Sequence, residues 1–276
     1  MRLFRKVAIV GTGLIGGSLA LAIKKNKMAE SVVGVSRHQK SLALAGKMGA
    51  IGQGSRNLDI IRGADLVILA TPVNTIIKLA PKISRFINKE CIVTDVGSTK
   101  EQVSKILGKL FPRYVGSHPL AGSEKRSILN ARSGIFKDSL CIITPTKNTD
   151  KAALNKINLL WRKAGAKVLV MSPQRHDRIL SLTSHLPHIL AFSLIGTVPR
   201  EFLRFSSGGL KDTTRIAASD SEIWSDIFLS NAKNISSGID AFLAGVSRIQ
   251  SAIRKNDARS LSRILRKAKK QREKLG

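Results

Sequence analysis

The chain has 276 residues, of which 43% are hydrophobic and 4% aromatic. This length suffices for one large globular domain or two medium ones, and so few aromatic side chains argue against a surface that stacks single-stranded nucleic acid. Lys and Arg number 47 against 18 Asp and Glu, a formal net charge of +29. The basic residues are spread over the sequence without a nucleic-acid motif, so we expect them to steer small anions rather than to bind nucleic acid specifically.

The N-terminal segment superficially resembles a signal peptide, because basic residues precede a mostly apolar run that begins at Val7. Four glycines between residues 11 and 17 argue against that interpretation, since a phosphate-binding turn requires them and an apolar signal helix does not. We also find no uncharged apolar run of the roughly 18 residues that a membrane span needs. The sequence therefore predicts a protein without membrane association.

Both cysteines, Cys91 and Cys141, lie in apolar runs that predict strands. A reduced thiol packs there as a small hydrophobic side chain, so a disulfide framework is not expected. This cysteine usage predicts a reducing, cytoplasmic location.

Short β-rich runs alternate with helical stretches over the first part of the chain. This alternation predicts an α/β fold with a mostly parallel sheet covered by helices on both faces. The expected strands span residues 6–10, 31–35, 64–70, 91–95, 114–116, 140–144 and 167–171.

The segment VAIVGTGLIGGS places glycines directly after the first expected strand and at the start of a helix. Gly11 permits a tight turn, Gly13 lets the backbone approach a pyrophosphate, and Gly16 brings helix and strand close together. A second strand follows, so the context is that of a Rossmann-type dinucleotide-binding domain. We assign Gly11, Gly13, Leu14, Ile15 and Gly16 to the cofactor site.

The end of the second expected strand reads Ser36, Arg37, His38, without the carboxylate that NAD-preferring folds usually place there. Arg37 can pair with a 2′-phosphate and Ser36 can donate a hydrogen bond, so we predict that NADP is preferred over NAD. Thr71 and Pro72 follow the third long strand at the sheet edge that binds ligands in such folds.

The pattern changes to helical periodicity after residue 171, where Ser172 is a good N-cap and Pro173 suits the first helical position. We therefore expect a dinucleotide-binding domain at residues 1–171 and a helical domain at residues 172–276. Its first helix is expected at about residues 173–195. A final amphipathic helix is expected at residues 251–275, with its apolar side against a second subunit and its basic side in solvent.

Several polar motifs remain: DVGSTK at residues 95–100, GSHPLAGSE at 116–124, HD at 176–177, SHLPH at 184–188 and GGLKDTTRIAASD at 208–220. This set, in this order and over nearly the whole chain, closely resembles the prephenate/arogenate dehydrogenase (cyclohexadienyl dehydrogenase) family. The resemblance implies a dinucleotide-binding domain followed by an all-α domain that forms a homodimer, with the active site between them. It also implies oxidative decarboxylation of prephenate or arogenate, with hydride transfer to NAD(P), in tyrosine biosynthesis.

By the same resemblance, His118 is the catalytic group that takes the proton of the substrate's ring hydroxyl. Imidazole suits this role because its unperturbed pKa of about 6.5 keeps it a free base at neutral pH. Ser98 is expected to orient that hydroxyl; alternatively, it caps a helix that starts at Thr99.

Arg215 is expected to bind a substrate carboxylate through its guanidinium fork, and His188 to contact the other end of the substrate. Further candidates for the pocket lining are Ser184, His185 and Trp224. Four charged residues either form ion pairs at the edge of the cleft or are ordinary surface charges: Glu124, Asp177, Lys211 and Asp212.

Three alternatives fit the sequence less well. A metal site of His176, His185 and His188 is disfavoured because Pro187 disturbs the helical register and the spacing matches no recognised ligand pattern. Another NADP-dependent reductase of the same architecture is disfavoured because it would not require GSHPLAGSE, SHLPH and KDTTR together. A basic NADP-binding regulatory or nucleic-acid-binding protein, in which the catalytic pocket has lapsed, is disfavoured by the intact His118, Ser98 and Arg215. The choice between prephenate and arogenate stays open.

Overall fold

The computed structural model describes residues 2–121 and 127–275. The chain divides into two compact units, Met1–Asn231 and Ala232–Gly276. The first unit contains a sheet and its covering helices together with the helices that follow, and the second is a pair of helices. This division does not test the predicted domain boundary near residue 171, which stays a prediction.

In the described residues, eight strands form one sheet in the order β3-β2-β1-β4-β5-β6-β7-β8. Neighbouring strands are parallel except for the antiparallel pair β6 and β7, so the predicted mostly parallel sheet is confirmed. The sequence missed β3 because it is short, polar and largely exposed. The strands are β1 Phe4–Val10, β2 Ala29–Val35, β3 Gln53–Ser55, β4 Leu66–Leu69, β5 Ile92–Asp95, β6 Tyr114–Pro119, β7 Leu140–Thr144 and β8 Lys167–Val170.

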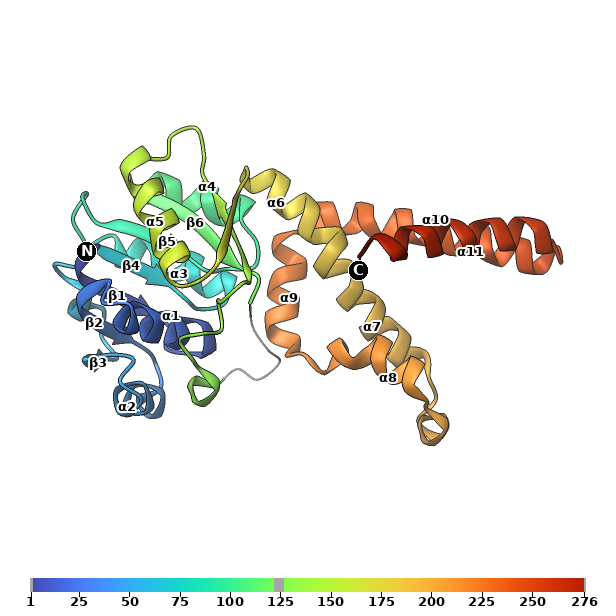
Figure 1. Cartoon of the computed structure of the whole chain (residues 1–276), viewed down its shortest axis with the longest axis horizontal. Coiled ribbons are helices and arrows are strands. Elements are labelled where there is room, and N and C mark those ends of the chain that lie inside the picture. Colours follow the sequence, from blue (N-terminus) through green and yellow to red (C-terminus); the bar gives the residue numbers. More distant parts are fainter. Residues whose placement is uncertain (1, 122–126, 276) are drawn as a thin grey trace. The chain divides into compact units, whose positions relative to one another are not determined.

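Helices connect the strands, and after β8 the described chain contains only helical elements (Figure 1). The α-helices of the first unit are α1 Leu14–Lys25, α2 Gln39–Lys47, α3 Val73–Ile83, α4 Glu101–Leu110, α5 Lys151–Lys163, α6 Pro173–Leu180, α7 Leu186–Thr197, α8 Gly208–Thr214 and α9 Ser221–Ser230. The second unit has α10 Ala232–Arg254 and α11 Ala258–Arg272. Shorter helical segments are η1 Leu58–Ile61, η2 Ile128–Asn130, η3 Ser181–His185, η4 Arg200–Phe205, η5 Arg215–Ala218 and η6 Glu273–Leu275.

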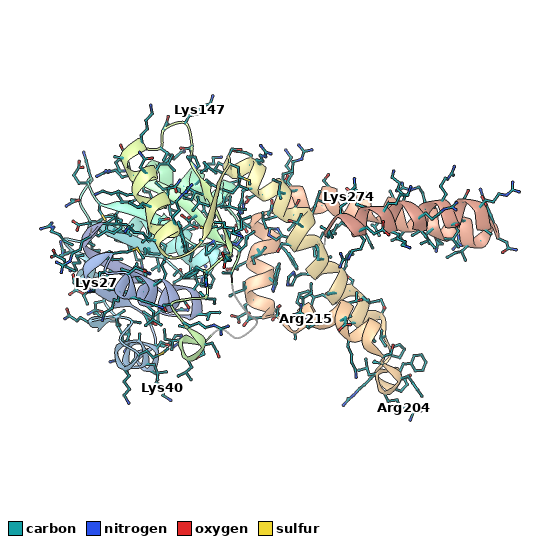
Figure 2. All side chains as sticks on the ribbon, viewed as in Figure 1. Lys27, Lys40, Lys147, Arg204, Arg215 and Lys274 are labelled. Carbon is teal, nitrogen blue, oxygen red and sulfur yellow. The ribbon has the colours of Figure 1, made fainter. Side chains whose placement is uncertain are left out.

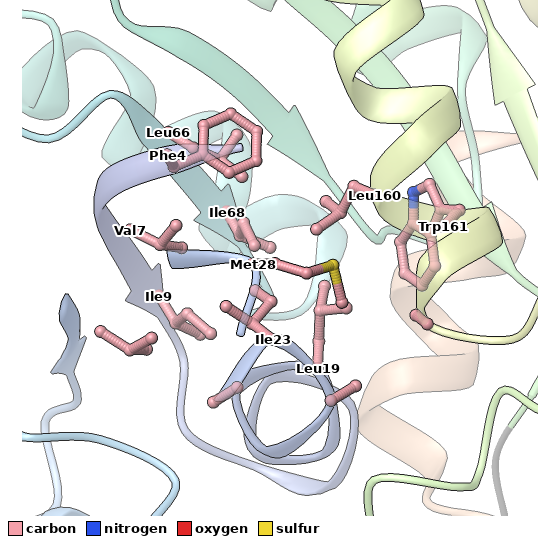
Figure 3. Packing of buried hydrophobic residues seen from close by; sticks show 14 of the residues in the cluster. Phe4, Val7, Ile9, Leu19, Ile23, Met28, Leu66, Ile68, Leu160 and Trp161 are labelled. Carbon is pink, nitrogen blue, oxygen red and sulfur yellow. The ribbon is translucent and has the colours of Figure 1, made fainter. Parts of the chain in front are cut away.

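Alternating side chains of the central strands build a separate hydrophobic core on each face of the sheet. In β1, Val7 and Ile9 belong to one core, whereas Ala8 and Val10 belong to the other. Helices α1, α2 and α5 cover the first core, whose packing Figure 3 shows, and α3 and α4 cover the second. Because both faces are buried, the central strands carry continuous apolar runs, as expected for a parallel sheet.

The topology brings the candidate site loops together at the carboxyl edge of the sheet. Strand β1 pairs with β2 on one side and β4 on the other, so the chain changes direction across the sheet at this point. Ligands of open α/β sheets bind at such a switch point. The glycine turn follows β1, and Thr71 follows β4 directly alongside it.

The helix predicted from residue 173 is confirmed, with a π-helical segment in its middle. Ser172 caps α6 by accepting a hydrogen bond from the Arg175 N–H, and Pro173 occupies the first turn. Segment η3 is π-helical and joins α6 to α7. Such π-turns are frequent at functional sites because the wider turn changes the direction in which side chains project.

The same helical stretch, Pro173–Thr197, is long and apolar enough to span a membrane by length and composition alone, with a mean hydropathy of 1.4 in its most apolar window. The prediction that no run reaches that length is therefore wrong on those two criteria. However, His176 and Asp177 in its first turns are buried and bonded to the sheet-bearing part of the same unit. The helix is thus part of the folded unit.

The single helix predicted at residues 251–275 is wrong, because the chain breaks between α10 and α11. Asn256 has a φ of +50°, a left-handed conformation that asparagine tolerates better than most residues. Asp257 then caps α11 by accepting a hydrogen bond from the Ser260 N–H. These two residues stop one helix and start the next.

Trp161 of α5 is fully buried and packs edge-on against Phe136, with ring centroids 5.3 Å apart. We expect Trp161→Ala to lower the free energy of unfolding by about 4 kcal/mol, because it removes a large apolar side chain and leaves a cavity. Urea unfolding measures the change. Leu159→Ala on the same helix is the control, since the Leu159 side chain is 39% exposed. This substitution should lower the free energy of unfolding by only about 0.5 kcal/mol. Equal losses would contradict this account of the core.

Candidate active site

The glycine turn after β1 packs directly against the end of β4. Gly11 has a φ of +104°, and a Cβ there would collide with the Ala70 carbonyl. A Cβ on Gly16 would collide with the Gly11 carbonyl oxygen and press on the side chains of Ala70 and Ile9. Both positions therefore need glycine, one for its backbone conformation and the other for the close approach of α1 to the sheet.

The start of α1 has the properties of an anion site. Its N-cap is Gly13, no acidic residue lies in its first turn, and no side chain in the described part of the chain caps it. The hydroxyls of Thr12 and Thr71 are buried beside this turn. Neither has a hydrogen-bond partner among the described residues. Free N–H groups with the positive end of a helix dipole fit a pyrophosphate, and both hydroxyls are available to it.

Of the remaining predicted cofactor residues, Leu14 and Ile15 open α1 and Pro72 is the N-cap of α3. Ser36 is half-buried after β2, where its hydroxyl accepts a hydrogen bond from the His38 N–H. All of these residues lie in segments that leave the carboxyl edge of the sheet.

A surface hollow of about 440 Å³ lies beyond the ends of β2 and β3, lined by Arg37, Arg56 and Asn57. The parallel pairing of Val35 with Ser55 carries both arginines to the same edge. Sequence reasoning found Arg37 but missed Arg56 and Asn57, because it did not predict β3. Two guanidinium groups at one hollow suit a phosphate monoester.

His118 projects from β6 and is the first of three side chains in a hydrogen-bonded chain. Its Nδ1 lies 2.8 Å from Nε2 of His176, and Nδ1 of His176 lies 2.7 Å from Oδ1 of Asp177. His118 is half-buried, whereas the other two side chains are buried. The sequence had placed His118 in the site but assigned no such partner.

Asp177 also holds the N-terminus of α4. Its Oδ1 accepts the Lys100 N–H at 2.8 Å and its Oδ2 accepts the Glu101 N–H at 2.9 Å. The alternative that Asp177 is a surface charge is therefore wrong. The alternative that Ser98 caps a helix starting at Thr99 is also wrong, because α4 starts at Glu101 and the carboxylate comes from α6.

A buried ion pair lies behind His118. The Lys100 ammonium contacts Asp95 Oδ2, and the Tyr114 hydroxyl donates to Asp95 Oδ1 at 2.7 Å. Burial and the Asp95 charge raise the pKa of Tyr114 well above its usual value, so it stays a donor. Burial holds the pKa of His118 well below 6.5, and charge on His176, Lys100 or His185 acts in the same direction. His118 is therefore a neutral imidazole at physiological pH.

His188 and Trp224 form an aromatic wall, with ring centroids 3.5 Å apart and planes inclined by 22°. Nδ1 of His188 lies 3.0 Å from the Ser184 carbonyl oxygen, so its protonated Nδ1 donates there and its Nε2 is an acceptor. His185 is buried, with the Asn231 amide donating to its Nδ1 at 3.2 Å. It therefore supports this wall from behind rather than lining a pocket.

Arg215 is the exposed C-cap of α8 (Figure 2). It forms no ion pair with any described residue, so its guanidinium is available to an anion. It is close enough to His188 for its charge to lower the pKa of that imidazole, after the larger effect of burial. Positive charge and an aromatic wall thus lie together, as binding of an anionic ring compound requires.

The structure does not join every predicted residue to the others. Ser98 is half-buried in the loop between β5 and α4, without a hydrogen bond to any described residue. Lys211 and Asp212 are exposed on α8 and form no ion pair with described residues. Glu124 lies outside the described residues.

Both parts of the chain match models of one protein family. Residues 19–170 match the model described as prephenate dehydrogenase, nucleotide-binding domain, and residues 172–267 match prephenate dehydrogenase, dimerization domain. The chain is 36% identical over 278 residues to a prephenate dehydrogenase of Bacillus subtilis, covering 97% of this chain and 75% of that protein. It is 35% identical over 285 residues to a cyclohexadienyl dehydrogenase of Zymomonas mobilis, covering 99% and 96% respectively.

A solved structure gives the same result. It is a crystal structure of prephenate dehydrogenase from A. aeolicus in complex with hydroxyphenyl propionate and NAD+. It superposes on this chain with a TM-score of 0.94 at 32% sequence identity, covering 99% of this chain and 98% of that one.

The buried histidines make the fold sensitive to acid. Burial lowers the pKa of His185 to about 4, so between pH 6.5 and about 4 the unfolded chain binds a proton there that the folded chain does not. The free energy of unfolding should therefore decrease as the pH is lowered from 6.5 to about 4. His185 alone should account for a decrease on the order of 3 kcal/mol at the lower end of this range. Urea unfolding at several pH values measures the slope.

His185→Gln should make that slope shallower, because glutamine does not titrate. Gln174→Ala, at an exposed position without a titrating side chain, is the control and should leave the slope as it is. Identical slopes for the wild type and His185→Gln would contradict the assignment.

Proposed function

Because the chain belongs to the prephenate dehydrogenase family, we propose that it oxidises and decarboxylates prephenate or arogenate with a nicotinamide cofactor, in tyrosine biosynthesis. The geometry supports this through one observation above others. A neutral, half-buried imidazole, that of His118, stands at the sheet edge that carries the phosphate-binding turn. A base of this kind is what removal of a hydroxyl proton at neutral pH requires.

The dinucleotide, when bound, accepts the hydride that leaves the hydroxyl-bearing ring carbon. Gly11, Gly13 and the first turn of α1 would hold its pyrophosphate, with Thr12 and Thr71 as added hydroxyl donors. The chain's own contribution is to bind, to orient and to move one proton.

In the proposed mechanism, Nε2 of His118 takes the proton of the ring hydroxyl as hydride leaves the same carbon. The bond to the ring carboxylate then breaks, its electron pair enters the ring, and carbon dioxide departs. The ring becomes aromatic, and His118 returns the proton to the phenolic oxygen. Ser98 is proposed to orient the hydroxyl during these steps.

Arg215 is proposed to bind one carboxylate of the substrate, because its guanidinium forms no ion pair within the described chain and presents two parallel donors. His188, whose Nε2 is a free acceptor on the Trp224 wall, is proposed to contact the side-chain end. Ser184 and Trp224 would line the pocket and His185 would support it. A keto group and an ammonium group can both meet this surface, so the proposal covers prephenate and arogenate alike.

We propose that NADP is preferred over NAD because the hollow beyond β2 and β3 presents Arg37 and Arg56 together. No carboxylate lies among its lining residues to repel a phosphate. Ser36, one residue before Arg37, supplies a further donor.

A cytoplasmic homodimer is proposed as the working form. The second family model is a dimerization domain, and it covers the helices from residue 172 onward. Large apolar side chains are exposed there: Leu182, Leu194, Phe202, Leu203, Phe205 and Leu243. A second copy of the chain would cover these side chains, whereas in a single chain they are exposed to solvent. The basic side chains Lys27, Lys40 and Lys147 lie at separate places on the first unit (Figure 2), which does not favour one nucleic-acid surface.

The proposed function is tested by an assay matrix of prephenate and arogenate, each with NAD and NADP, in which nicotinamide reduction is followed by absorbance. We expect turnover with at least one of the two acids, and release of carbon dioxide equal to the nicotinamide reduced. Absence of turnover in all four combinations would exclude the proposal.

His118→Asn is the matched variant in that assay. It should lower kcat by at least about 100-fold, because asparagine cannot act as a base, while leaving the Kd for NADP almost unchanged. Wild-type turnover in this variant would remove His118 from the mechanism.

Arg37→Ala and Arg56→Ala should each weaken NADP binding by about 10- to 100-fold, the loss expected for one charge-assisted contact to a phosphate. NAD binding should change little, because NAD lacks that phosphate. Calorimetry with both cofactors makes the comparison. Arg162→Ala removes the same charge from the exposed surface of α5 and controls for general attraction. Equal losses for NAD and NADP would contradict the preference.

A further inference from the structure

The side chains of His118, His176 and Asp177 form an unbroken line from the candidate base into the protein. The two bonds in this line measure 2.8 and 2.7 Å, and both inner side chains are buried. Water therefore does not compete for them. In each imidazole, one nitrogen carries the proton and the other accepts, so the line has a direction set by its innermost member.

Asp177 sets that direction because its carboxylate only accepts. Two backbone N–H groups, those of Lys100 and Glu101, already donate to it at the N-terminus of α4, where negative charge is favourable. Nδ1 of His176 must therefore carry the proton and donate to Oδ1. Burial keeps His176 neutral, so its Nε2 bears a lone pair.

The consequence passes to the next ring. Nε2 of His176 can only accept, so Nδ1 of His118 must be protonated and must donate to it. The lone pair of His118 is then on Nε2, the nitrogen that points away from the line. A free imidazole favours the opposite tautomer, with the proton on Nε2, which could not take a proton from that side.

We propose that His176 is a positioning residue that, together with Asp177, holds His118 in the tautomer whose Nε2 is the base. The proposal rests on the proposed function for its kinetic consequence, but the tautomer itself is a property of the protein alone. When His118 takes the substrate proton, its Nδ1–H bond to His176 strengthens, and the Asp177 charge stabilises the new cation two hydrogen bonds away.

The other charged groups near His118 do not provide this polarity. Lys100 and Asp95 neutralise each other in the buried pair behind the ring, and the Tyr114 hydroxyl is used by Asp95. His185 is held by Asn231. Within the described residues, only His176 forms a hydrogen bond with the ring of His118.

Nitrogen NMR of the ¹⁵N-labelled protein, without substrate or cofactor, tests the tautomer directly. The ring signals of His118 are assigned as those missing from His118→Asn. We expect Nδ1 of His118 to be the protonated nitrogen in the wild type. In His176→Phe, which keeps a ring but cannot accept, the proton should move to Nε2. In His176→Gln, whose carbonyl oxygen can accept, it should stay on Nδ1.

Kinetics test the consequence. With the better substrate of the assay matrix, His176→Phe should lower kcat by about 100-fold or more while the KM for substrate changes little, because binding groups are untouched. His176→Gln should recover most of that loss. A merely structural role would not predict rescue by the smaller amide.

Leu180→Ala is the control for damage to α6, since Leu180 is a buried side chain of the same helix. It should lower the Tm while leaving the His118 tautomer as in the wild type. A wild-type protein with the proton on Nε2 of His118, or a folded His176→Phe variant with wild-type kcat, would overturn the proposal. Absence of turnover by the wild type would instead fail the proposed function, and the NMR result would still decide the tautomer.

Discussion

The buried carboxylate of Asp177 is the interaction on which the candidate site depends. It accepts from two backbone N–H groups at the start of α4 and from His176, and so joins α6 to the sheet. An unpaired buried charge would be strongly destabilising, and these three donors compensate the burial of the carboxylate. Because one side chain both anchors a helix and orients an imidazole, the site and the framework are stabilised together.

A consequence is that this side of the candidate site is built from neutral imidazoles. Burial lowers the pKa of His118, His176 and His185. Each ring therefore has one donor and one acceptor nitrogen, and its neighbours decide which is which. The Lys100 and Asp95 pair behind them adds no net charge. Positive charge is supplied instead by Arg215, which is exposed and close to His188.

The cofactor side is built from backbone rather than from charge. Glycines at residues 11 and 16 let α1 approach the sheet, and the uncapped start of that helix faces the edge where β1 and β4 end. A separate feature is the hollow at the ends of β2 and β3, which Arg37 and Arg56 line together. The proposed phosphate binding and the proposed choice of cofactor thus fall to different segments of the same sheet.

The sequence by itself determined the features that depend on near neighbours. Apolar runs and their alternation predicted seven of the strands within a few residues, the glycine spacing predicted the turn, and Ser172 with Pro173 predicted the start of α6. Motif resemblance added His118 and Arg215. Only the tertiary structure decided which side chains meet across long separations: Asp177 with the start of α4, His176 with His118, and Arg56 with Arg37. Periodicity and capping act over a few residues, whereas these pairings depend on strand register and on how helices pack, which no local pattern records.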